Sequence, residues 1–104
     1  MPRSQSHKRA QSKAAGRGGK TEVKLKGGKR LDALTQSGKR ATEIEKSGTI
    51  AGLKKAAQRL KLRRAKQKVL QVPQKDMIKA VKAMREVGVK GTVKNMSGNK
   101  RRPV

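Results

Sequence analysis

The 104-residue sequence contains no Phe, Tyr or Trp, so a hydrophobic core can contain only Val, Leu, Ile, Met and Ala. A core of that kind is small in a chain of this length, and we expect one domain of marginal stability. The chain carries 30 Lys and Arg residues against six Asp and Glu, and the net charge of +24 repels itself when the chain is compact. A polyanionic partner is therefore expected to balance the charge.

Nucleic acid, either DNA or RNA, is the polyanion that this composition indicates. Because there are no aromatic rings on which bases stack, contacts to phosphates and grooves are expected instead. The absence of Cys excludes disulfides and thiolate metal sites. The sequence has no apolar run of the roughly 20 residues that a membrane helix needs, and no signal-peptide pattern at its start. We expect a cytoplasmic monomer or homodimer, associated with the nucleoid or the ribosome, and no membrane partner.

Both ends of the chain are basic and contain few large apolar residues. Residues 1–20 combine Ser, Gln, Gly and Ala with six basic residues and no acid, a composition typical of a disordered arm. Residues 97–104 are interpreted as a second basic tail, which leaves residues 21–96 for a single small α/β domain. His7, the only histidine, falls in the arm, and no catalytic or metal-binding role is expected for it.

Alternating apolar and polar residues, bounded by turn signals, predict the strands of this domain. Gly27-Gly28 and Ser37-Gly38 supply the first two turns. The expected strands lie at residues 21–26, 30–35, 41–46, 69–72 and 89–96.

Two helices are expected between these strands. Thr49 is a suitable N-cap for the first, whose apolar residues repeat at three or four positions from Ile50 to Leu60. The second contains Met77 and Met84, and Gly88 closes it. The order β-β-β-α-β-α-β includes strand–helix–strand steps, which imply some parallel pairing. The predicted fold class is α+β or α/β, a small mixed sheet with two helices and disordered basic tails.

Three of the six acids, Asp32, Glu43 and Glu45, lie on the second and third expected strands. If Ser37-Gly38 is a two-residue turn, Asp32 lies opposite Glu43 and Arg30 opposite Glu45, all on one face. Opposed carboxylates destabilise a strand pair unless a positive group lies between them. That group is either a divalent cation such as Mg²⁺ or a cross-strand Lys or Arg, and both interpretations stay open.

The run Arg30-Leu31-Asp32-Ala33-Leu34, a turn and then Thr42-Glu43-Ile44-Glu45-Lys46 resembles the core of the PD-(D/E)XK nuclease superfamily. In that family an Asp ends one strand, an acid–any–Lys motif occupies the next, and a helix and a parallel strand follow. The resemblance covers residues 22–73 and implies a metal-dependent nuclease. Asp32 and Glu43 would bind Mg²⁺ or Mn²⁺, and Asp32, Glu43 and Glu45 would be catalytic. Glu45 stands where the family has Lys, and the helix that usually precedes the first strand is missing here unless part of the arm folds.

Ten basic residues and no acid occur between Lys46 and Lys75, so the first helix has no acidic partner at i+4 for its cations. This one-sided run favours phosphate contacts over a merely solvated helix face. The residues expected to contact nucleic acid are Arg17, Lys20, Arg30, Lys54, Lys55, Lys61, Arg63, Arg64, Arg101 and Arg102. The sequence therefore predicts a nucleic-acid-binding protein, either a metal-dependent nuclease or a non-catalytic DNA- or RNA-binding module.

Overall fold

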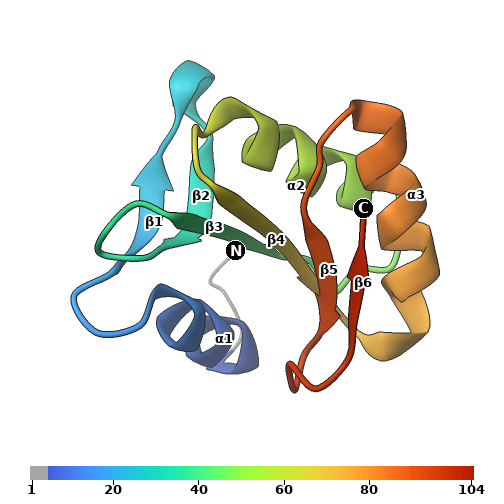
Figure 1. The fold of residues 1–104 in the computed structure, drawn as a ribbon, viewed down its shortest axis with the longest axis horizontal. Helices are drawn as coiled ribbons and strands as arrows, with labels where there is room; N and C mark the ends of the chain where they lie inside the picture. The colour runs from blue at the N-terminus through green and yellow to red at the C-terminus, as the bar shows by residue number, and fades with distance from the viewer. Residues whose placement is uncertain (1–4) are drawn as a thin grey trace.

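The computed structural model describes residues 5–104, which form a six-stranded mixed sheet and three α-helices (Figure 1). The elements are α1 (Gln5–Ala15), β1 (Lys20–Lys24), β2 (Arg30–Leu34), β3 (Arg40–Ile44), α2 (Ile50–Leu62), β4 (Gln67–Val72), α3 (Met77–Val87), β5 (Thr92–Asn95) and β6 (Arg101–Pro103). Short 3₁₀ turns at Lys26–Gly28 and Gln74–Asp76 follow β1 and precede α3. The expected small mixed α/β class is confirmed, with one more helix and one more strand than the sequence predicted.

The strands lie side by side in chain order, β1 to β6. Pairs β1–β2, β2–β3 and β5–β6 are antiparallel, whereas β3–β4 and β4–β5 are parallel. Helices α2 and α3 make the two parallel crossovers, and successive right-handed crossovers in one direction place both helices on the same face. Helix α1 packs against β1, β2 and β3. It lies on the other face, because Thr42 and Gln71 line a cleft with α1 while Leu70 and Val72 enter the core.

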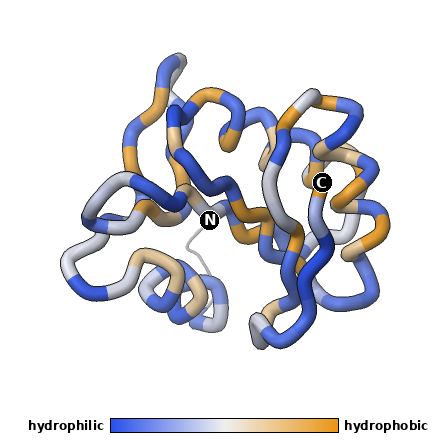
Figure 2. Tube along the Cα trace, in the orientation of Figure 1, coloured by the Kyte–Doolittle hydropathy of each residue, from blue (hydrophilic) through white to orange (hydrophobic). Residues whose placement is uncertain are grey.

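The core between the sheet and helices α2 and α3 is entirely aliphatic, as the composition requires. Leu31, Leu53, Leu60, Leu70 and Met84 are its largest apolar side chains, and each is 0% exposed. Small Ala residues on both helices let the backbones approach this layer closely. Figure 2 shows the resulting pattern, in which hydrophobic residues recur along α2, α3 and the inner strands while β6 is hydrophilic.

The two predicted helix signals are confirmed, Thr49 at the start of α2 and Gly88 at the end of α3. The Thr49 hydroxyl accepts a hydrogen bond from the Gly52 amide at 3.0 Å and caps α2. Gly88 follows α3 with a φ of 86°, a left-handed conformation that glycine adopts without a Cβ clash. The Val89 amide donates to the Met84 carbonyl at 2.9 Å, and the Gly88 amide donates to that of Arg85 at 3.2 Å. This pair of bonds is a Schellman motif.

The structure differs from the expected disordered arm, since residues 5–15 form α1; residues 1–4 of that arm lie outside the described residues. The segment consists largely of the helix-favouring residues Gln, Lys, Arg and Ala. His7, Gln11 and Ala15 recur every four residues and form the buried stripe. Because two of these three side chains are polar, the stripe has no apolar periodicity from which a helix could be predicted.

The expected C-terminal tail also differs, because Arg101–Pro103 pairs with β5 as the edge strand β6. Asn95 fixes the intervening turn from both ends of its side chain. Its Oδ1 accepts from the Lys100 amide at 3.2 Å, and its Nδ2 donates to Asn99 Oδ1 at 2.7 Å. Within residues 5–104, no helix has the length and apolar character needed to cross a bilayer.

We predict that Leu70→Ala lowers the free energy of unfolding by about 2–5 kcal/mol, because it leaves a cavity in a core without aromatic side chains. Leu62→Ala is the matched control, since Leu62 is 45% exposed, and its expected effect is within about 0.5 kcal/mol. Urea unfolding followed by circular dichroism measures both. Equal effects of the two substitutions would contradict this description of the core.

Candidate nucleic-acid interface and buried carboxylate pair

Asp32 and Glu43 join strands β2 and β3 through their carboxylates. The ladder between these strands pairs Ala33 with Thr42 and Leu34 with Ala41, in the register predicted from the Ser37-Gly38 turn. Beyond it, Glu43 Oε2 accepts from the Asp32 amide at 2.7 Å and Asp32 Oδ2 accepts from the Ile44 amide at 2.8 Å. Each carboxylate therefore satisfies a backbone amide of the opposite strand. Both side chains are buried, with 1% of each residue exposed.

Helices from both faces of the sheet complete this buried pair. From α1, His7 Nε2 lies 3.2 Å from Asp32 Oδ1, and Gln11 Nε2 donates to the same oxygen at 3.2 Å. From α2, Arg59 NH1 donates to Glu43 Oε1 at 3.4 Å. Sequence reasoning missed His7 and Gln11, and their helical spacing of four was the available signal.

Glu45 does not join the pair. Its backbone amide donates to the Gln71 carbonyl at 3.0 Å, and its Oε1 accepts from the Ser47 amide at 3.3 Å. Arg30 pairs with Lys24 of β1 and is exposed. Hydrogen bonds therefore join Asp32 to Glu43, whereas Glu45 bonds to the Ser47 turn instead. The physical reason is that β3 beyond Ile44 bonds to β4 and turns towards α2, away from β2.

Strand β1 is irregular beside Asp32. Glu22 falls between the paired residues Thr21–Ala33 and Val23–Leu31, at the position opposite Asp32. Its φ of 51° lies in the left-handed region, which is unfavourable for a residue with a Cβ. Such backbone strain concentrates where the surrounding structure enforces a local geometry. Asp32 therefore lies opposite a residue of β1 with a strained backbone and next to the end of the β2–β3 ladder.

Burial raises the pKa of Glu43 to about 8, and the nearby Asp32 charge adds to the rise. The amide of Asp32 and the guanidinium of Arg59 act in the opposite direction. Their effect is smaller because the Arg59 contact is long, at 3.4 Å, and its side chain is 30% exposed. A pKa of about 8 favours the protonated form of the Glu43 carboxyl at neutral pH.

The donor types at this position suit a divalent cation, because carboxylate oxygens are the ligands that Mg²⁺ prefers. Each of the four carboxylate oxygens lies within hydrogen-bond distance of a polar nitrogen. Within residues 5–104, no three His, Cys, Asp or Glu side chains form a metal-binding group. The two carboxylates are thus suitable ligands for a divalent cation. Binding of the cation would require Arg59, His7 and Gln11 to give up their contacts with these carboxylates.

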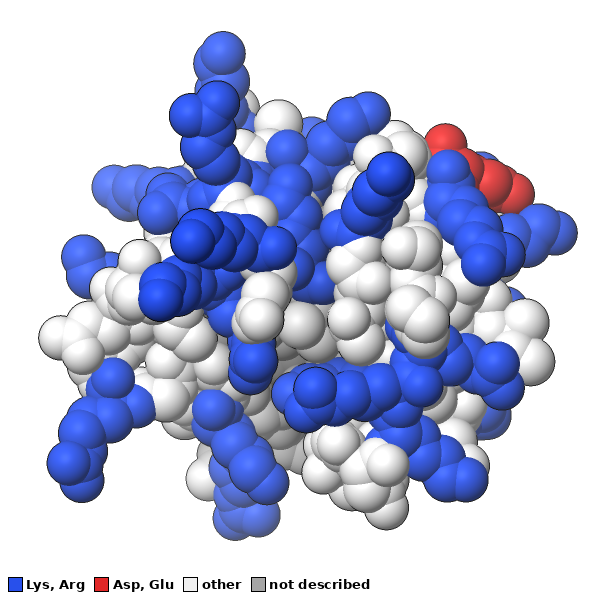
Figure 3. All heavy atoms as spheres, viewed as in Figure 1, with Lys and Arg blue, Asp and Glu red and all other residues white. Residues whose placement is uncertain are grey.

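The surface of the protein is more positive than its composition indicates. Three of the six acids, Asp32, Glu43 and Asp76, are buried. Glu86 is exposed and forms an ion pair with Lys54, with 2.8 Å between Oε2 and Nζ. Figure 3 shows Lys and Arg side chains spread over most of this view, with acidic atoms confined to one area at its upper right. Folding therefore removes acids from the surface and leaves the cations there.

The cations predicted to contact nucleic acid do not share one face. Lys54 pairs with Glu86, and Lys61 Nζ donates to the Val87 carbonyl at 3.0 Å, so both are engaged between α2 and α3. Arg101 lies on the opposite face of the sheet, in a cleft with β3, β4 and β5. The remaining predicted contacts are exposed apart from Arg63, which is partly buried, and they are Arg17, Lys20, Arg30, Lys55, Arg64 and Arg102.

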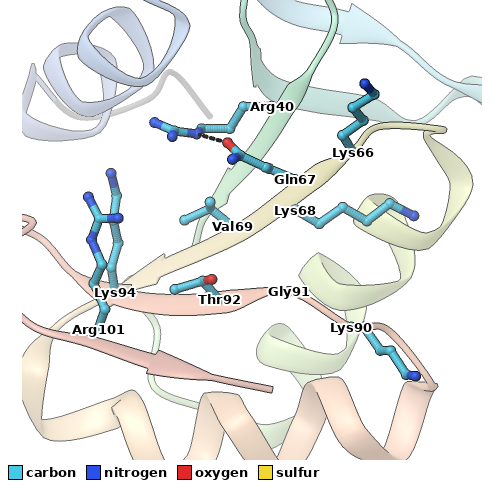
Figure 4. A pocket seen from close by; sticks show the side chains of 10 residues that line it. All are labelled: Arg40, Lys66, Gln67, Lys68, Val69, Lys90, Gly91, Thr92, Lys94 and Arg101. Carbon is cyan, nitrogen blue, oxygen red and sulfur yellow. Dashed lines mark hydrogen bonds between the residues drawn. The ribbon is translucent and has the colours of Figure 1, made fainter.

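Helix α1 covers only part of its face of the sheet, and beside it strands β3–β6 form a cleft of about 270 Å³ (Figure 4). We name it the sheet cleft. Its cations are Arg40, Lys66, Lys68, Lys90, Lys94 and Arg101, and none of its lining residues is acidic. Sequence reasoning named Arg101 alone, because the other five are spread over separate strands and loops. The alternation of Lys66 and Lys68 along the chain was the one local signal.

Comparison of the chain with protein-family models, with curated proteins and with solved structures finds no match. The functional assignment therefore depends on the geometry and the charges described above.

We predict that stability falls as pH rises from about 5 to 8, owing to Glu43. In this range the unfolded chain has lost the Glu43 proton, whereas the folded protein retains it up to its pKa of about 8. Glu43→Gln, which keeps the shape without the titration, should flatten this dependence and stabilise the protein at pH 8. Thermal unfolding of wild type and variant at pH 5, 6.5 and 8 measures the difference.

Glu45→Gln is the control, because Glu45 belongs to the same strand end but lies outside the pair. It should leave the pH dependence intact. A Glu43→Gln variant whose melting temperature follows pH like the wild type would contradict the assignment of the raised pKa.

Proposed function

We propose that this protein binds nucleic acid through its positively charged surface. The observation that carries the proposal is the burial of Asp32, Glu43 and Asp76, which leaves the surface cations with few acidic neighbours. A surface of this kind releases counterions from a phosphate backbone on binding, and that release drives association. Small anions carry no condensed counterions to release, so a polyanion is the favoured partner.

The absence of aromatic residues and the positions of the cations support contact with phosphates rather than base recognition. We propose a binding module that recognises the backbone of DNA or RNA with little sequence preference. In a cell, such a protein would be associated with the nucleoid or the ribosome in the cytoplasm.

We predict that the affinity for a duplex of 20 base pairs or a matching RNA falls steeply with salt. The slope of log K against log salt concentration should be steeper than about −4, because each neutralised phosphate contributes about −0.9. Fluorescence anisotropy between 50 and 200 mM KCl measures it. A flat dependence would contradict binding through phosphate contacts.

A second candidate function is divalent-metal-dependent cleavage of the bound nucleic acid. Two features favour it: helix α1 precedes β1, as in the PD-(D/E)XK core, and Asp32 and Glu43 bridge the second and third strands. The α2 crossover to a parallel β4 agrees with the same arrangement. Glu45 is engaged with Ser47, so the proposal assigns the chemistry to Asp32 and Glu43.

In this second function Asp32 and Glu43 would hold Mg²⁺ or Mn²⁺. A bound cation supplies charge stabilisation at the scissile phosphate and an activated water. Glu43 would give up its proton on binding the cation, since a ligating carboxylate is ionised. Arg59, released from Glu43, would then be available to the phosphate as a positive group.

We predict that any Mg²⁺- or Mn²⁺-dependent cleavage of plasmid DNA or RNA by this protein falls about a hundredfold or more in Asp32→Asn. Asn keeps an oxygen that accepts from the Ile44 amide, so the variant should fold. Glu86→Gln is the control, because Glu86 is exposed and paired with Lys54. Cleavage that persists in Asp32→Asn, or in EDTA, would reject this centre. If no substrate is cleaved, the nuclease function is rejected and only the binding function remains.

A further inference from the structure

Four cations from four different elements converge where the sheet cleft meets helix α1. Lys94 of β5 and Arg101 of β6 lie directly opposite each other in the antiparallel ladder. Arg40 of β3 lines the sheet cleft with them, and Lys13 of α1 shares an adjoining cleft of about 230 Å³ with Arg40 and Lys94. We name these four residues the cation cluster. In Figure 4 Lys94 and Arg101 extend in parallel, and the guanidinium of Arg40 points towards their charged ends.

The cation cluster is unfavourable by itself. Like charges directly opposite each other on neighbouring strands destabilise a sheet. Burial lowers the pKa of Lys94, and the charges of Arg101, Arg40 and Lys13 lower it further. No acid lines either cleft, so no side chain there neutralises the four charges. An arrangement that costs stability and has no internal counter-charge is expected at a site that binds an external anion.

The surroundings of the cluster also suit an anion. The Arg40 Nε atom donates to Gln67 Oε1 at 2.9 Å, which orients the guanidinium and leaves its terminal nitrogens on the side of Lys94. The neighbouring part of the cleft is lined by the small residues Val69, Gly91 and Thr92. Gly91 has no room for a side chain, because a Cβ there would lie 2.1 Å from the Lys68 carbonyl oxygen. This part of the cleft floor therefore carries only short side chains.

We infer that the cation cluster of Lys13, Arg40, Lys94 and Arg101 is a specific binding site for a phosphate group of nucleic acid. Arg and Lys together suit this ligand, because a guanidinium bonds two phosphate oxygens in a fork and an ammonium adds a point charge. The phosphate is either an internal diester or a terminal monoester, which carries more negative charge. The inference deepens the proposed function and rests on it for the nucleic acid, while the site itself is testable with inorganic phosphate.

The first experiment titrates the protein with inorganic phosphate at constant ionic strength and follows backbone amides by NMR. The expected result is saturable shifts confined to β3, β5, β6 and the end of α1, together with a rise in melting temperature. In the double variant Lys94→Gln/Arg101→Gln, the apparent affinity for phosphate should fall at least about tenfold. Both the NMR shifts and the rise in melting temperature should then need correspondingly more phosphate. The double variant should melt no lower than wild type in phosphate-free buffer, because the substitution removes a repulsion.

The matched control is Lys82→Gln/Arg85→Gln, which removes the same charge from exposed positions of α3 on the other face of the sheet. It should retain the phosphate response. Shifts that are not saturable, or that the control abolishes equally, would overturn the site and indicate a diffuse response to charge.

The second experiment distinguishes the two sources of the phosphate. Two oligonucleotides of one sequence are compared, one with a 5′-phosphate and one with a 5′-hydroxyl. If the 5′-phosphate tightens binding in wild type but not in the double variant, the site takes a terminal phosphate. If the double variant loses affinity for both oligonucleotides equally and by more than the control does, the site takes an internal diester. No difference between the double variant and the control would overturn the inference.

The two experiments also separate this inference from the proposed function. Binding of oligonucleotides without a saturable phosphate site would leave the proposed function in place and remove the inference. A saturable phosphate site without oligonucleotide binding would retain the anion site and reject nucleic acid as the partner.

Discussion

The exchange of hydrogen bonds between Asp32 and Glu43 connects the layers of this protein. Each carboxylate accepts a backbone amide of the other strand, and each also contacts a helix, α1 for Asp32 and α2 for Glu43. Polar groups buried in this way are costly unless all their partners are present. The pair therefore ties the position of α1 to the spacing of β2 and β3. The aliphatic core holds α2 and α3, whereas Ala15 is the one buried apolar residue of α1, which therefore depends more on its polar contacts.

Charge and stability oppose each other on the two faces of the sheet. The face under α2 and α3 is a compact aliphatic layer, and the face beside α1 carries cations without acidic neighbours. Three of the few acids are buried, so they do not offset the surface charge. A small core then has to overcome the repulsion among 30 basic residues. Binding of a polyanion would relieve this repulsion, so affinity and stability are linked in this protein.

Local chemistry in the sequence was sufficient for most of the elements. Thr49 and Gly88 limit their helices because a hydroxyl cap and a left-handed glycine act within a few residues. The Ser37-Gly38 turn set the register that places Asp32 beside Glu43, since loop length determines pairing in a hairpin. Helix α1 was not predicted, because it is held by the polar residues His7 and Gln11, whose partner Asp32 is distant in the sequence. Strand β6 was not predicted, because the turn before it depends on hydrogen bonds of the Asn95 side chain.

The sequence by itself determined the composition of the core, the excess of positive charge and the order of the central elements. These follow from side-chain type and from spacing over a few residues. Only the tertiary structure decided which acids are buried, that Glu45 lies apart from Asp32 and Glu43, and that Lys13, Arg40, Lys94 and Arg101 meet. The last group comes from one helix and three strands, separated by up to 88 positions between Lys13 and Arg101. Residues that far apart are brought together by sheet order and helix packing, and no local pattern in the chain records that contact.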